Sequence, residues 1–102
     1  MEESITIVLE NQDIVSGVCG ANDSNLRVIE NALGGRIATR GNILRLENCD
    51  EALGHKIRLV IDHLIQAVQK GEHPSPDYVR SLTLTIESED QKGTLEPAIH
   101  QF

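Results

Sequence analysis

The chain has 102 residues, of which 39% are hydrophobic and 2% aromatic, and nine basic side chains against sixteen acidic ones give a formal charge of -7. This length fits one domain and excludes a two-domain enzyme, and no apolar run reaches the roughly 20 residues of a membrane-spanning helix. One Tyr, one Phe and no Trp disfavour a stacking platform for bases or sugars, and the net charge opposes attraction of the whole surface to nucleic acid or anionic lipid.

The first third of the chain predicts one strand followed by two helices. Ser4 to Glu10 is β-branched and apolar with partial alternation, which is typical of a strand. Gln12 to Gly20 predicts one or two helical turns. A cluster of capping residues at 22–25 then precedes apolar residues at helical spacing, so we expect a helix that begins near residue 24 and stops at Gly34-Gly35.

The middle of the chain predicts a hairpin and a long helix. Ile37 to Arg40 and Ile43 to Leu46 flank Gly41-Asn42, a pair typical of a hairpin turn. From Asp50 to about Lys70 an apolar stripe at helical spacing predicts an amphipathic helix. The order β-α-α-β-β-α therefore predicts an α+β fold, a three-stranded sheet covered on one face by helices.

The last third of the chain is harder to assign. His73 to Pro76 ends the long helix, after which residues 77–82 fit a last helical turn while Leu82 to Ile86 alternates as a strand would. Both assignments stay open. Because the chain is polar from Glu87 onward, we expect a domain over residues 1–82 and a linker or tail over residues 83–102.

The positive charge is concentrated in the middle of the chain. All four basic residues within 17–46 are arginines, whose guanidinium group suits bidentate contact with phosphate, and only Asp23 and Glu30 oppose them there. The arginines either line one RNA-facing surface or are separate surface charges that pair with Asp23, Glu30 and Glu47. These candidate RNA-binding residues are Arg27, Arg36, Arg40 and Arg45.

The remaining reactive side chains form no recognisable catalytic or metal site. Cys19 and Cys49 stand far apart in neither a CxxC nor a CxxH spacing, so we expect two reduced thiols and neither a disulfide framework nor a zinc site. His55 and His63 are eight residues apart on one predicted helix, too far to share an ion. No secretory signal is visible at the acidic N-terminus, so we expect a cytoplasmic protein.

The predicted order of elements resembles the KH domain, in which a GxxG loop between the first two helices clamps a nucleic-acid backbone. Aspartate stands at the fourth position of the equivalent loop here, where it adds a side chain and a negative charge beside the phosphate position. Asp23 and Asn25 also fit roles as helix N-caps or local loop-bonding groups. The loop equivalent to GxxG consists of Gly20, Ala21, Asn22 and Asp23.

A longer pattern, CG..D.NL..IE..LG..I..RGN, is similar to the N-terminal region of bacterial PhoH-like proteins, the phosphate-starvation-inducible family. It runs from Cys19-Gly20 to Arg40-Gly41-Asn42, and the resemblance spans about residues 4–82. In that family this region precedes a P-loop ATPase domain, whereas GxxxxGK[ST] is absent from this chain. The resemblance therefore implies an accessory domain, with ATP and Mg²⁺ expected for the ATPase domain of the parent protein.

Two functions follow from this resemblance. The first is a non-catalytic KH-like accessory domain that assists RNA binding by the parent protein. The second is a protein-interaction or assembly module that docks on the ATPase domain, or on an endoribonuclease of rRNA maturation, without touching RNA; the acidic net charge and the altered loop favour it. An enzyme in its own right is not expected, because the sequence contains no Ser-His-Asp set, metal set or paired carboxylates at a recognisable site.

Overall fold

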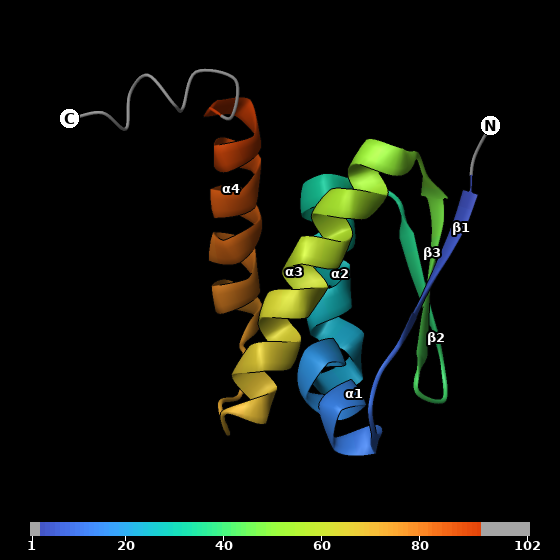
Figure 1. Ribbon diagram of the computed structural model, residues 1–102. Helices are drawn as coiled ribbons and strands as arrows, with labels where there is room; N and C mark the ends of the chain where they lie inside the picture. Colours follow the sequence, from blue (N-terminus) through green and yellow to red (C-terminus); the bar gives the residue numbers. More distant parts are fainter. Residues whose placement is uncertain (1–2, 93–102) are drawn as a thin grey trace.

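The computed structural model of the chain describes residues 3–92 and consists of a three-stranded sheet with helices packed on one face (Figure 1). The predicted α+β fold and the KH-like order β-α-α-β-β-α are confirmed, and a further helix follows. In chain order the elements are β1 (Glu3–Val8), α1 (Gln12–Cys19), the short 3₁₀ helix η1 (Ala21–Asp23), α2 (Ser24–Leu33), β2 (Arg36–Arg40), β3 (Ile43–Cys49), α3 (Glu51–Gln69) and α4 (Pro76–Lys92).

The sheet is antiparallel, with β3 between β1 and β2. Since successive side chains of a strand point to opposite faces, Leu44 and Leu46 of β3 are fully buried under the helices, whereas Ile43 and Arg45 are exposed on the other side. We call this second side the open face, because no described element covers it (Figure 1).

The core lies between the sheet and the helices, and Val79 and Ile86 of α4 belong to the same cluster. Ile7, Leu44 and Leu46 of the strands pack in one cluster with Ile29 of α2 and Ile57 of α3. Helix α3 approaches β1 closely at Gly54, where a methyl group would overlap the Cδ1 atom of Ile5. A larger residue at this position would force the Ile5 side chain to shift.

Helix α3 begins and ends as its sequence predicts. The Asp50 side chain accepts a hydrogen bond from the N–H of Leu53 at 2.8 Å, which caps the first turn. Gly71, just past the helix, adopts a φ of 91°. None of the helices in the described range is long and apolar enough to cross a membrane.

Helix α4 corrects the predicted end of the domain. Residues 77–86 form neither a single turn nor a strand but part of one helix that extends to Lys92. Val79, Thr83 and Ile86 recur at helical spacing and are buried, and the Thr83 hydroxyl donates to the carbonyl of Arg80 at 2.7 Å, so its burial leaves no unpaired polar group. Residues 83–92 thus belong to a helix, not to a linker, and the rest of the predicted tail, 93–102, lies outside the described residues.

Candidate nucleic-acid interface

Three of the four predicted arginines lie on the open face of the sheet. Arg36 and Arg40 alternate with the buried Ile37 on β2, and Arg45 alternates with buried leucines on β3. Arg45 is registered opposite Ala38, which places it diagonally between the two β2 arginines, and diagonal neighbours across strands are about 7–8 Å apart. All three side chains are exposed. We call Arg36, Arg40 and Arg45 the arginine cluster.

The arginine cluster has no ion-pair partner among the described residues. The proposed pairing with Asp23, Glu30 and Glu47 is therefore wrong within this part of the chain. The Glu30 carboxylate instead accepts the backbone N–H of Ile37 at 2.7 Å, which fixes the start of β2 to α2. Glu47 shares the open face and is registered opposite Arg36, but no ion pair joins them.

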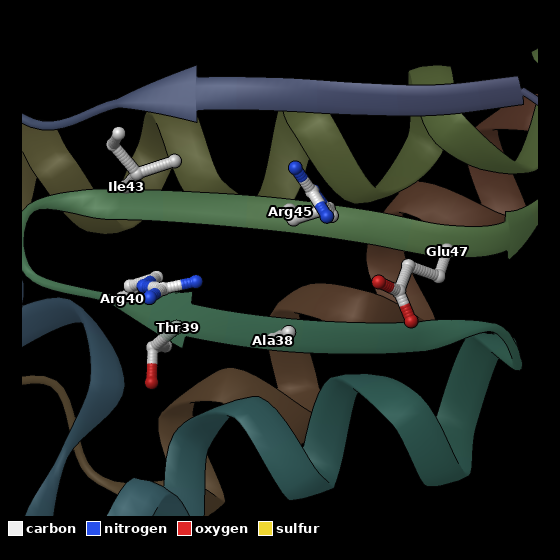
Figure 2. Close-up of a pocket in the computed structure, with 6 residues that line it drawn as sticks. All are labelled: Ala38, Thr39, Arg40, Ile43, Arg45 and Glu47. Atoms are coloured by element: carbon white, nitrogen blue, oxygen red, sulfur yellow. The ribbon is translucent and has the colours of Figure 1, made fainter.

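A depression of about 320 Å³ lies on the open face, and Arg40 and Arg45 of the arginine cluster line it. Figure 2 shows Arg40 and Arg45 on neighbouring strands, Glu47 farther along β3, and Thr39 pointing away from the two arginines. Two guanidinium groups beside the apolar surface of Ala38 and Ile43 offer hydrogen bonds and charge to an anion. The depression is lined by Ala38, Thr39, Arg40, Ile43, Arg45 and Glu47.

Arg27 does not join the arginine cluster. It is exposed on α2, one turn before Glu30, and α2 belongs to the helical layer on the other side of the sheet (Figure 1). The loop over residues 20–23 connects α1 to α2 as predicted, and it also belongs to the helical layer. The candidate site residues are thus divided between two surfaces.

Asp23 occupies the predicted N-cap position of α2 but does not cap the helix through its side chain, and the predicted capping role of Asn25 is wrong. Asp23 precedes α2, but its φ of 59° is left-handed and its side chain makes no capping hydrogen bond, because a capping side chain requires an extended backbone to reach the first free N–H groups. Asn25 is fully buried. Its Nδ2 donates to the carbonyl of Pro74 at 3.1 Å, which ties α2 to the segment before α4.

The two cysteines are packed in the interior. Burial, and secondly the charge of Asp23, raises the pKa of Cys19 from 9.0 to about 11, so its thiol is protonated and weakly nucleophilic at neutral pH. The Cys49 thiol donates to the carbonyl of Glu47 at 3.2 Å. Within residues 3–92, no cluster of three or more His, Cys, Asp or Glu side chains is arranged to hold a metal ion.

Sequence reasoning missed an apolar pair on the open face. Val8 and Ile43 are registered opposite each other and are 67% and 38% exposed. The signal was present in the sequence, because Val8 lies between Ile7 and Leu9, both of which face the core. The open face thus carries two large apolar side chains, one on β1 and one on β3, beside the arginine cluster on β2 and β3.

Comparison with known proteins gives one relationship. Over 70 residues, which are 67% of this chain, the sequence is 39% identical to PhoH-like proteins of Mycobacterium bovis and of two strains of Mycobacterium tuberculosis. The chain spans only about a fifth of those proteins, since the matched region is 19% of their length. No family model and no solved structure matches the chain. The chain is related to bacterial PhoH-like proteins through this region.

Proposed function

We propose that this chain is a non-catalytic, KH-like accessory domain of a PhoH-like protein and that it contributes phosphate contacts when that protein binds RNA. The sequence relationship supports the family, and the order of strands and helices supports a KH-like domain. The observation that carries the RNA-binding role is the arginine cluster, three exposed arginines on one face without ion-pair partners in the described chain.

The arginine cluster suits the RNA backbone better than the bases. Guanidinium groups make bidentate hydrogen bonds to phosphate oxygens, whereas the open face carries no aromatic side chain on which a base could stack. Three phosphate contacts to a single strand give a salt slope of about -2, so the affinity falls about 20-fold between about 50 and about 200 mM salt. We expect binding with little preference for sequence.

The altered loop is consistent with contacts that lie on the sheet instead of between the helices. A GxxG clamp brings backbone N–H groups close to phosphate, but this loop places the Asp23 carboxylate at its fourth position. Asn22 and Asp23 both have left-handed backbone angles, with φ of 55° and 59°, so the loop keeps a glycine-like shape while its charge opposes phosphate. Three of the nine basic residues of this chain are instead grouped on the open face.

ATP and Mg²⁺ do not fit the residues of this chain. The sequence has no GxxxxGK[ST] to hold a triphosphate, and residues 3–92 offer no carboxylate cluster for a metal ion. We therefore assign ATP chemistry to a P-loop ATPase domain of the parent protein. In this proposal the parent protein is cytoplasmic and belongs to the phosphate-starvation response.

The test compares two double variants that remove equal charge. Fluorescent single-stranded RNA is titrated with the wild type, with Arg40→Ala/Arg45→Ala, and with Lys70→Ala/Arg80→Ala. Lys70 is exposed at the C-cap of α3 and Arg80 is exposed on α4, both in the helical layer. We expect the first variant to lose most of the affinity and to reduce the salt slope to about -0.7, and the control to retain both. Equal losses in the two variants, or no binding by any protein, would refute the RNA role.

The apolar pair on the open face favours a second function, docking on another protein. Val8 and Ile43 are large and exposed, as expected at the centre of a protein interface. In this case the open face docks on the parent ATPase domain or on an rRNA-maturation endoribonuclease. Co-purification of either protein with the wild type, and not with Val8→Lys/Ile43→Lys, would support docking, particularly if the same double variant still bound RNA.

A further inference from the structure

The two edges of the sheet differ in how their backbone groups are satisfied. The N–H of Leu9 donates to the carbonyl of Asn42 at 2.7 Å, in register with the β1–β3 ladder. Because hydrogen-bonded pairs alternate along antiparallel strands, Ile5 and Ile7 also turn their peptide groups toward β3. Thr6 and Val8 therefore turn theirs outward, away from the sheet.

By the same alternation, Ile37 and Thr39 of β2 turn their peptide groups outward at the edge of the sheet, away from β3. That edge is partly closed, because the Glu30 carboxylate accepts the outward N–H of Ile37 at 2.7 Å and α2 packs beside β2. A side-chain acceptor on an edge N–H prevents another strand from pairing at that position. One edge of the sheet is thus protected by the fold itself.

The edge at β1 has no such protection in the described chain. No described residue donates to or accepts from the outward peptide groups of Thr6 and Val8. Proline and basic side chains, which commonly block edges, are absent from Ile5–Val8, and Val8 is 67% exposed. A β-branched edge strand of this kind is suited to pairing with another strand.

We propose that β1 pairs antiparallel with β1 of a second copy of this chain, so that the two sheets join into one. Helix α3 supplies the argument for a second copy. Gly54 packs against Ile5 of β1, and Arg58 and Asp62 follow at successive turns on that flank, both exposed and without ion pairs in the described chain. A two-fold axis at the strand pair sets the two α3 helices antiparallel and brings Arg58 toward Asp62 of the other copy.

Dimerisation at β1 does not require RNA binding, but it would change the affinity of the chain for RNA. Joining the sheets at β1 leaves both open faces on the same side, so the two arginine clusters form one surface. A single strand long enough to reach both clusters then binds more tightly than one cluster allows, through effective concentration. Dimerisation without RNA binding, or RNA binding by a monomer, separates the two proposals.

Sedimentation of the 102-residue chain over a range of concentrations tests the pairing. Thr6→Pro removes an outward N–H from the open edge without breaking the β1–β3 ladder, because proline is tolerated at edge positions whose N–H faces solvent. Thr39→Pro makes the same change at the outer edge of β2 and is the matched control. We expect a wild-type monomer–dimer equilibrium, at least about tenfold weaker dimerisation for Thr6→Pro, and no change for Thr39→Pro, with circular dichroism confirming that both variants fold.

Two further measurements identify what occupies the edge. The Thr6 and Val8 amides should exchange hydrogen faster as the protein is diluted; protection of both amides in the monomer at every dilution would show that the chain covers its own edge, and would overturn the proposal. Arg58→Asp should weaken the dimer and Arg58→Asp/Asp62→Arg should restore it. A wild type that stays monomeric at millimolar concentration, or equal dimerisation of the two proline variants, would also overturn the proposal.

Discussion

The two faces of the sheet are built from alternate residues of the same strands, yet their chemistry is opposite. On β3, Leu44 and Leu46 are fully buried, whereas Ile43 and Arg45 are exposed. The covered face is apolar and supports the core, whereas the open face carries three arginines together with the exposed side chains of Val8 and Ile43. Substitutions at neighbouring positions of one strand should therefore have different effects. Those on the covered face should reduce stability, and those on the open face should reduce binding.

The largest effect is expected on the covered face. Leu46→Ala removes a fully buried side chain from the centre of the sheet and should lower the free energy of unfolding by about 2–5 kcal/mol. Urea denaturation followed by circular dichroism measures this loss. Ile43→Ala, on the same strand but partly exposed, should cost less than about 1 kcal/mol, and similar losses in the two variants would contradict the assignment of faces.

The second largest effect is a pH dependence of the stability, caused by the buried Cys19 thiol at the end of α1. Burial, and then the charge of Asp23, raises the pKa of Cys19 from 9.0 to about 11. The folded chain thus holds a proton that the unfolded chain releases above pH 9, so the stability is full below pH 9 and falls as the pH rises toward 11, by on the order of 2 kcal/mol. Thermal unfolding of the wild type and Cys19→Ala over this pH range isolates the contribution, since other titrating groups are common to both. Parallel pH profiles would refute it.

A smaller effect on stability is expected at the outer edge of β2, where the Glu30 side chain binds the Ile37 N–H. Glu30→Ala removes the acceptor of the Ile37 N–H and should lower the free energy of unfolding by about 1.5 kcal/mol, the lower end for a hydrogen bond to a charged group, because the contact is only partly buried. Glu30→Gln keeps an acceptor and should cost less. The exposed neighbour Asn31→Ala should have no effect, and chemical denaturation of the three variants distinguishes a specific contact from a general change in α2.

Most of the architecture could be predicted from the sequence because its signals are local. The Asp50 cap, Gly71 and apolar spacing indicated the ends of α3, Gly34-Gly35 indicated the end of α2, and Gly41-Asn42 indicated the hairpin. The sequence left a helical turn over residues 77–82 open but not the full length of α4, because Leu82, Leu84 and Ile86 alternate as in a strand. The helical spacing of the buried residues of α4 can be recognised only when the packing of α4 against α2 and α3 is known.

The candidate site was harder to predict because it depends on tertiary placement. Alternation with Ile37 and Leu46 could have assigned Arg36, Arg40 and Arg45 to one face. The separation of Arg27 required knowing which side of the sheet α2 covers. Asn25 looked like a cap, but its hydrogen-bond partner, the Pro74 carbonyl, is 49 residues away in the sequence, beyond the reach of any local pattern.

The smallest effect on stability is expected one residue from the largest. Arg45→Ala removes an exposed side chain that has no ion pair in the described chain and should change the free energy of unfolding by less than about 0.5 kcal/mol. RNA affinity at low salt should nevertheless fall, and the salt slope should flatten by about 0.7. Arg45→Lys keeps the charge but loses the planar fork, so it should retain the slope while recovering only part of the affinity. If Arg45→Ala destabilised the fold as Leu46→Ala does, the residue would serve the structure, and its exposure on the open face would say nothing about RNA.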